Sequence, residues 1–132
     1  MNVQHLQRAN AVRALVAAIV LSALGIPAHA QSRQVIGYAG VLGEWELTAD
    51  VTEAGAGEFS GPASMTHVGV CTQDGPERKN GKIRLQMSAS RLNATLSLAG
   101  IECTYDARLS DAYKGQMSCP GRPPMSLTMW VR

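Results

Sequence analysis

Beyond residue 30, the side chains best suited to nucleophilic, redox or metal chemistry are one histidine, His67, and the three cysteines Cys71, Cys103 and Cys119. A strand rises about 3.3 Å per residue, so His67 and Cys71 would lie roughly 13 Å apart on one strand and could not share a metal ion. A single histidine also excludes a histidine-pair metal site within one chain. We therefore expect no enzyme, no catalytic residues, no metal site and no cofactor.

Two of the cysteines belong to one stretch, IECTYDARLSDAYKGQMSC, which covers residues 101–119. If residues 110–112 form a three-residue loop, Cys103 and Cys119 face each other on neighbouring strands. The Cβ atoms of such a pair lie about 4.5–5.5 Å apart or closer, near the separation that a disulfide requires. We expect a Cys103–Cys119 disulfide and a free thiol at Cys71. A bridge from Cys71 to either partner, or no bridge, remains open at this point.

The elements that would position these side chains are strands, because apolar and polar residues alternate through most of the chain. Ala99-Gly100 would form a two-residue turn that places Leu98 opposite Ile101. The fold class predicted is all-β, an antiparallel up-and-down barrel or a closely packed sandwich of seven to eight short strands. The alternating runs cover residues 43–51, 58–71 (with a bend or bulge at Gly61-Pro62), 83–87, 92–98, 101–109, 113–119 and 125–132.

The N-terminus has the features of a secretory signal. Arg8 and Arg13 precede an apolar run at residues 14–26, and Ala28-His29-Ala30 resembles a cleavage site. The apolar run is shorter than the ~20 residues that span a bilayer. We expect residues 1–30 to be a signal peptide, residues 31–41 an N-terminal arm and residues 42–132 a single barrel domain. The protein would then be exported, periplasmic or secreted, without stable membrane insertion after cleavage.

Charge excludes one class of partner. Two of the 12 Lys and Arg residues and none of the 10 Asp and Glu residues precede residue 31, so cleavage leaves no net charge. A nucleic-acid partner would need a net basic face and is not expected. The charges are divided along the chain, with residues 31–77 acidic and residues 78–132 basic. We expect the two parts to pair across strands.

The sequence TQDGPERKNGK, residues 72–82, is polar and contains the loop formers Gly, Pro and Asn. It is predicted to be the longest loop. Because loops on a rigid scaffold often carry binding residues, it is the candidate contact loop. Its charged and amide residues are Asp74, Glu77, Arg78, Lys79 and Asn80.

The last strand suggests a second contact. Alternation places Trp130 on the outer face together with Arg132. An outward Trp beside an Arg forms a local stacking pair or an interface anchor. Trp130 and Arg132 are therefore candidate surface-contact residues.

Gly43-Glu44-Trp45 opens the first predicted strand, and a meander of short strands follows. This resembles the calycin-type barrels, in which lipocalins, avidins and small bacterial metalloprotease inhibitors begin with G-x-W on strand one. The resemblance implies a closed barrel with Trp45 at one end and a binding function. Arg132 would correspond to the arginine that lipocalins place over this Trp, although alternation points it outward.

The function expected is that of a small exported, non-enzymatic binding module. Its partner would be a protein or a small apolar ligand, and inhibition of an enzyme is one form of this. The alternative is a structural or envelope-interaction module with a filled barrel and contacts through its outer face. An internal cavity under ~300 Å³ would count against the small-ligand form.

Overall fold

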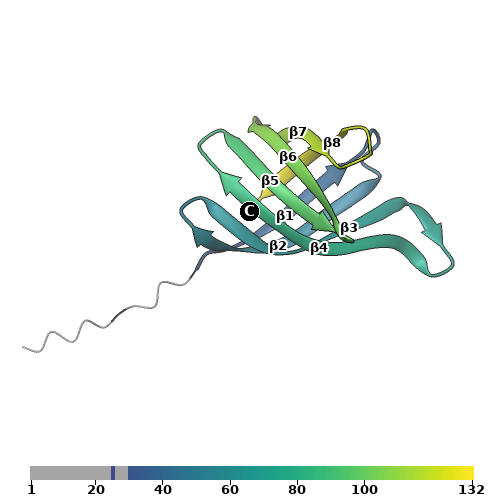
Figure 1. Cartoon of the computed structure of the whole chain (residues 1–132), viewed down its shortest axis with the longest axis horizontal. Helices are drawn as coiled ribbons and strands as arrows, with labels where there is room; N and C mark the ends of the chain where they lie inside the picture. Colours follow the sequence, from purple (N-terminus) through teal and green to yellow (C-terminus); the bar gives the residue numbers. More distant parts are fainter. Residues whose placement is uncertain (1–24, 26–29) are drawn as a thin grey trace, which may run out of the picture.

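The computed structural model describes Gly25 and residues 30–132, with backbone only for Val70, Cys71 and Thr72. The predicted signal peptide lies almost entirely outside the described residues. The described chain forms eight antiparallel strands in sequence order (Figure 1). They are β1 (Ser32–Ala39), β2 (Trp45–Gly55), β3 (Glu58–Thr72), β4 (Gly75–Met87), β5 (Arg91–Leu98), β6 (Ile101–Leu109), β7 (Tyr113–Ser118) and β8 (Met125–Val131).

The strands close into a barrel, because each pairs with its neighbours in sequence and β1 also pairs with β8. The interior holds one apolar cluster, to which every strand contributes. No polar or charged residue is among the fully buried side chains described. An eight-strand barrel is just wide enough for side chains to fill it. The all-β barrel prediction is confirmed.

Two hairpin registers follow the alternation of the sequence. Leu98 lies opposite Ile101 across the turn at Ala99-Gly100, and both turn residues have positive φ, 50° and 79°. This is the backbone that a two-residue type I′ turn needs. Leu109 lies opposite Tyr113 across the expected three-residue loop. Both registers keep apolar side chains on the inner face.

The expectation of an N-terminal arm at residues 31–41 is wrong. Residues 32–39 form β1, which pairs with β2 on one side and with β8 on the other. Val35 and Ala39 are fully buried, so this strand supplies part of the core. Alternation in SRQVIGYA is weak because Gly37 lies at an inward position, and the strand is stabilised by two neighbours distant in sequence.

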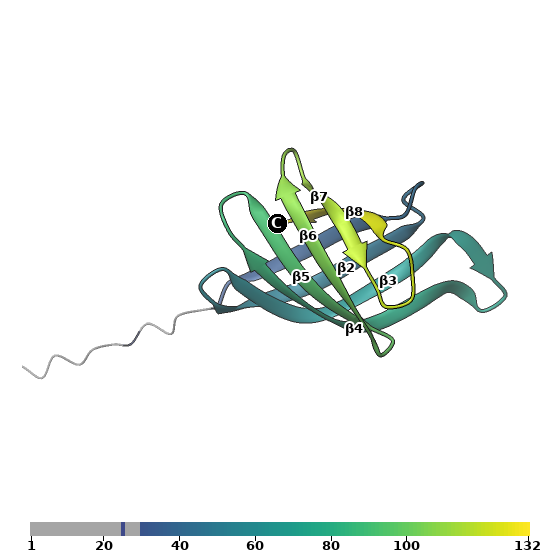
Figure 2. The ribbon, with the colours of Figure 1, turned by 45° about the horizontal axis from the view of Figure 1, so that its top comes forward.

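The expected loop at residues 72–82 is also different in the structure. β3 continues to Thr72 and β4 begins at Gly75, so most of this segment is a paired hairpin. The hairpin extends beyond the rest of the barrel (Figures 1 and 2). Polar composition suggested a loop, but a hairpin outside the barrel is exposed on both faces and needs no apolar alternation.

The Gly61-Pro62 step, expected to be a bend or bulge, lies inside continuous strand β3. Both residues pair with β4, opposite Ile83 and Lys82. On the β2 side, pairing stops at Ala63 and resumes at Ser60. Proline has no N–H to donate, and Pro62 lies within this gap in the pairing of β3 with β2, so β3 continues through Pro62.

The up-and-down order gives the barrel two distinct ends. We call the end with the β1–β2, β3–β4, β5–β6 and β7–β8 connections the mouth, and the opposite end the base. In Figure 1 the hairpin of β3 and β4 marks the mouth on the right.

Among the described residues, no helix has the length and apolar character required to cross a bilayer.

Candidate functional site

The mouth contains a pocket of about 80 Å³. Its wall is mostly apolar, and Lys79 and Arg122 are its two charged lining residues. The Cys103–Cys119 disulfide forms another part of the wall. The remaining lining residues are Trp45, Met65, Leu98, Ile101, Met117, Pro123 and Met125.

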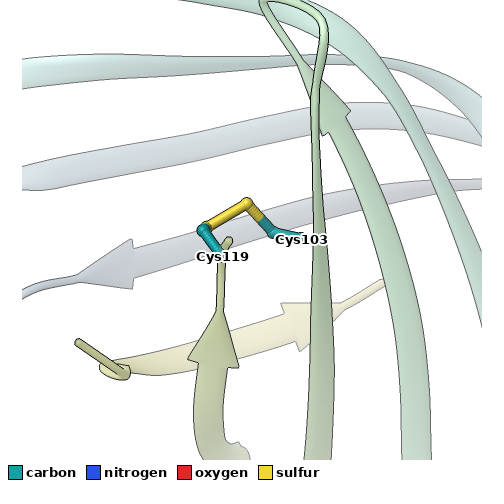
Figure 3. Close-up of a disulfide and its surroundings, with 2 residues drawn as sticks. All are labelled: Cys103 and Cys119. Atoms are coloured by element: carbon teal, nitrogen blue, oxygen red, sulfur yellow. A yellow bond between two sulfur atoms is a disulfide. The ribbon is translucent and has the colours of Figure 1, made fainter. Parts of the chain in front are cut away.

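The disulfide joins β6 to the end of β7, with an S–S distance of 2.04 Å (Figure 3). Extending the β6–β7 register by one pair places Cys103 opposite Cys119, as the sequence predicted. Cys103 is buried and Cys119 is partly buried against the core. The side chain of Cys71 lies outside those described, so the predicted free thiol stays a prediction.

Trp45, the first residue of β2, is partly buried at the mouth and contacts two side chains. The His67 ring meets it edge-on, with centroids 4.5 Å apart. The Lys79 ammonium lies 5.1 Å from the centre of its ring, within the range of a cation–π interaction. The cation–π contact with Trp45 holds Lys79 at the pocket wall. The predicted position of Trp45 at one end of the barrel agrees with the structure.

The β1–β2 loop presents two apolar side chains to solvent at the mouth. Val41 is 95% exposed and Leu42 is 90% exposed. Gly40 and Gly43 flank them with positive φ values of 95° and 64°, and the Gly43 amide donates to the Gly40 carbonyl. The loop is therefore an ordered turn with apolar residues at its tip.

Glu44 anchors this loop. Its carboxylate accepts a hydrogen bond from the Leu42 amide at 3.0 Å. Hydrogen bonds from its own amide and from Leu42 lower the pKa of Glu44, and the charge of His67 adds to this. The carboxylate therefore stays ionised and bound to the loop backbone, and the Glu44 carbonyl accepts from the Val68 amide of β3.

The five residues of the predicted contact loop separate in the structure. Lys79 lines the pocket, and Glu77 lies beside it with a carboxylate–ammonium distance of 4.0 Å. Asn80 accepts a hydrogen bond from the Ser64 hydroxyl. Asp74 is in the hairpin turn, and Arg78 is exposed. Only Lys79 belongs to the pocket.

The predicted contact pair at the C-terminal end of the chain, Trp130 on β8 and Arg132 just after it, has a different geometry from that expected. Trp130 meets the Tyr38 ring edge-on at 6.2 Å, so its described aromatic partner is Tyr38. Arg132 forms backbone hydrogen bonds with Gln34 at the base. Arg132 is thus at the end opposite Trp45, and the lipocalin-like placement of an arginine over that Trp is wrong. Lys79 occupies that place.

At the base, an arginine does cover an aromatic ring, but neither residue was predicted. The Arg33 guanidinium lies 5.2 Å from the centre of the Phe59 ring. Arg33 is on β1, which was expected to be an arm. Its Nε is buried and has no hydrogen-bond partner among the described atoms.

The sequence also missed the exposed tip at Val41 and Leu42. A usable signal was present, since two apolar residues stand between glycines in GVLG. The expected boundary between the arm and the barrel domain fell between Val41 and Leu42 and divided this pair.

No group of three or more His, Cys, Asp or Glu side chains among the described residues is arranged to hold a metal ion. No protein family matches the chain, and no curated protein or solved structure is significantly similar to it.

Proposed function

We propose that the protein is an exported, non-enzymatic binding module that contacts a protein partner through the mouth of its barrel. The observation that carries this proposal is the ordered β1–β2 loop, which holds Val41 and Leu42 almost fully in water. Burying a valine or leucine side chain contributes about 1.5–3 kcal/mol. A folded protein that holds two of them at a loop tip can gain this free energy on binding.

The size of the pocket favours a protein over a small ligand inside the barrel. Ligand sites usually measure about 300–1,000 Å³. The mouth pocket measures about 80 Å³, well below that range. The small-ligand form of the prediction therefore loses support.

The charges at the mouth favour a protein over a lipid surface. The mouth has no excess of basic residues, because Arg78, Lys79 and Arg122 are accompanied there by Glu44, Glu46, Asp74, Glu77 and Glu102. Binding to anionic lipids or to nucleic acid depends on an excess of basic residues. A protein partner can match such a mixed surface locally, with acidic groups only where Lys79 and Arg122 lie.

Three further parts of the proposal have partial support. The disulfide favours an oxidising compartment, periplasmic or extracellular. Glu44 and His67, which lie beside the pocket residue Trp45, contact the Leu42 amide and the Trp45 indole ring, which favours a binding role over catalysis. The closed eight-strand meander supports a calycin-like relationship, although Gly43-x-Trp45 opens the second strand and not the first.

Site-specific photo-crosslinking in the host cell tests the proposal. A photoreactive residue replaces Leu42 at the mouth, and in a matched control it replaces Leu109, which is 44% exposed at the base. We expect a protein adduct from position 42 and none from position 109. Excess purified wild-type protein should suppress the adduct, whereas the double variant Val41→Ser/Leu42→Ser should not.

Three outcomes would contradict the proposal. A third variant carries the photoreactive residue at Trp130. Adducts from this position and none from position 42 would favour the structural module that contacts its partner through the outer face. Adducts with lipid alone would replace the protein partner by a membrane. Equal suppression by the double variant would remove the loop tip from the contact. The double variant should unfold at the wild-type temperature, because both side chains are exposed.

A further inference from the structure

The volume of the mouth pocket limits what can enter it. A water molecule needs about 10–15 Å³ of such volume. The pocket of about 80 Å³ therefore admits a group of roughly five to eight heavy atoms. A leucine or methionine side chain, with four heavy atoms, fits within this volume, and a phenylalanine side chain, with seven, nearly fills it.

The wall suits an apolar group whose shape is not fixed in advance. Met65, Met117 and Met125 contribute to it, together with the disulfide. Methionine is flexible and polarizable, and it is used where a surface must adapt to its partner. Trp45 adds a rigid aromatic face.

The charged lining residues are both positive. Lys79 is held against Trp45, with one acidic neighbour, Glu77, at 4.0 Å. Arg122 is exposed and forms no ion pair with any described residue. No acidic side chain is among the described residues that line the pocket. A group that enters it meets apolar contacts in the interior and two cations at the sides.

We propose that the mouth pocket binds one apolar side chain from an acidic segment of the partner, with neighbouring carboxylates paired to Lys79 and Arg122. This inference rests on the proposed function and defines the chemistry of its partner. Arg122 can bind a carboxylate through two parallel hydrogen bonds, and Lys79 acts as a point charge. Val41 and Leu42 are not pocket-lining residues, so they form a separate contact.

The test is a titration of the ¹⁵N-labelled mature protein, residues 31–132, with three acetylated and amidated pentapeptides. The acidic probe is Asp-Glu-Leu-Glu-Asp. The others replace the central Leu by Ser, or the four acidic residues by Lys and Arg. We expect the acidic probe to shift the indole resonance of Trp45 and the amide resonances of Ile101 and Arg122. Both other peptides should bind at least about tenfold more weakly.

Two pairs of variants locate the binding. Lys79→Gln/Arg122→Gln should weaken the binding of the acidic probe by about two- to thirtyfold, since two ion pairs are lost and each pair near the surface contributes up to about fivefold. Its control is Arg108→Gln/Lys114→Gln on the outer faces of β6 and β7. Ile101→Trp should fill the pocket and block binding. Its control is Leu109→Trp, at the other end of β6.

The inference is overturned if the basic peptide binds as tightly as the acidic one. It is also overturned if neither Lys79→Gln/Arg122→Gln nor Ile101→Trp changes the affinity more than its control does. A third contrary result is an acidic probe that leaves the Trp45 resonance unshifted at millimolar concentration. Val41→Ser/Leu42→Ser should leave peptide binding unchanged. Crosslinking at position 42 without peptide binding therefore rejects this inference alone, and peptide binding without that crosslink rejects the proposed function.

Discussion

Tyr105 illustrates how one side chain connects three strands. It lies on β6 and is only 2% exposed. Its hydroxyl donates a hydrogen bond shared between the carbonyl oxygens of Leu127, at 2.8 Å, and Tyr113, at 3.1 Å. These carbonyls belong to β8 and β7. Alternation identifies Tyr105 as a core residue, but only the folded barrel supplies the two acceptors.

Replacing Tyr105 by Phe removes this donor from the interior of the barrel. We expect Tyr105→Phe to lower the free energy of unfolding by about 0.5–1.5 kcal/mol, measured by chemical denaturation. Tyr38→Phe is the control, because Tyr38 is exposed and no hydrogen bond of its hydroxyl is found among the described residues. Equal losses in the two variants would contradict the role of the buried hydroxyl.

Tyr105 also gives the stability a pH dependence. Burial raises the pKa of its phenol in the folded state, so folding favours the neutral form. In the unfolded chain the phenol titrates near pH ~10. The stabilisation is complete below that pH and is lost as the pH rises toward the higher folded value. Denaturation curves of the wild type should show this loss above pH ~10, and those of Tyr105→Phe should show a smaller one.

Strand curvature depends on glycines at close approaches between neighbouring strands. A methyl group on Gly61, Gly81 or Gly115 would collide with the carbonyl oxygen of Asp50, Ser97 or Asp106, respectively. Closing a small barrel requires such bends at defined positions. In the sequence Gly61 and Pro62 interrupt the alternation, and we expected a bend or bulge there. Within the sheet, Gly61 allows the strand to curve and continue.

Gly61→Ala tests this role. The new methyl group meets the backbone of β2, which cannot move without disturbing the sheet, and we expect a loss of about 1–3 kcal/mol. Gly55→Ala is the matched control on β2, where the nearest atom is the end of the Glu58 side chain at 3.3 Å. That variant should change stability by less than about 0.5 kcal/mol. Thermal unfolding of both variants provides the comparison, and similar melting temperatures would reject the close-approach role.

For the whole molecule, β1 decides whether the sheet closes. It pairs with both β2 and β8, and Gln34 and Arg132 exchange backbone hydrogen bonds of 3.0 and 2.9 Å. Without β1, both β2 and β8 become open edges, which invite pairing with other chains.

The acidic part of the chain, residues 31–77, and the basic part, residues 78–132, meet in this closed barrel without the ion pairing that we expected. Among the described ion pairs only Lys79–Glu77 joins them, and the acidic strands β2 and β3 stay distinct from the basic strands that follow.

Deleting residues 31–39 from the mature protein should abolish the cooperative unfolding transition and cause association. Adding a synthetic peptide of residues 31–39 should restore the near-UV circular dichroism of the folded barrel. The control peptide carries the same residues in scrambled order. A deleted protein that stays monomeric and unfolds cooperatively would restore the arm interpretation.

The sequence by itself determined the all-β fold class and two hairpin registers, and it favoured the Cys103–Cys119 bridge over a bridge from Cys71. Alternation is a local property, and each of those hairpins has a short connection, so neighbouring residues decide which side chains face each other. The position of Trp45 at one end of the barrel was implied by the resemblance of Gly43-x-Trp45 to the calycin-type barrels, and alternation alone did not indicate it.

Only the tertiary structure decided what meets at the two ends of the barrel. The mouth pocket takes residues from every strand except β1 and from the β7–β8 connection, and no local pattern relates Lys79 to Arg122 or to Trp45. β1 became a strand only because β2 and β8 each offered it a free edge. Barrel closure joins segments far apart in the chain. This long-range pairing placed Val41 and Leu42 at the mouth, with the pocket, and Arg132 at the base.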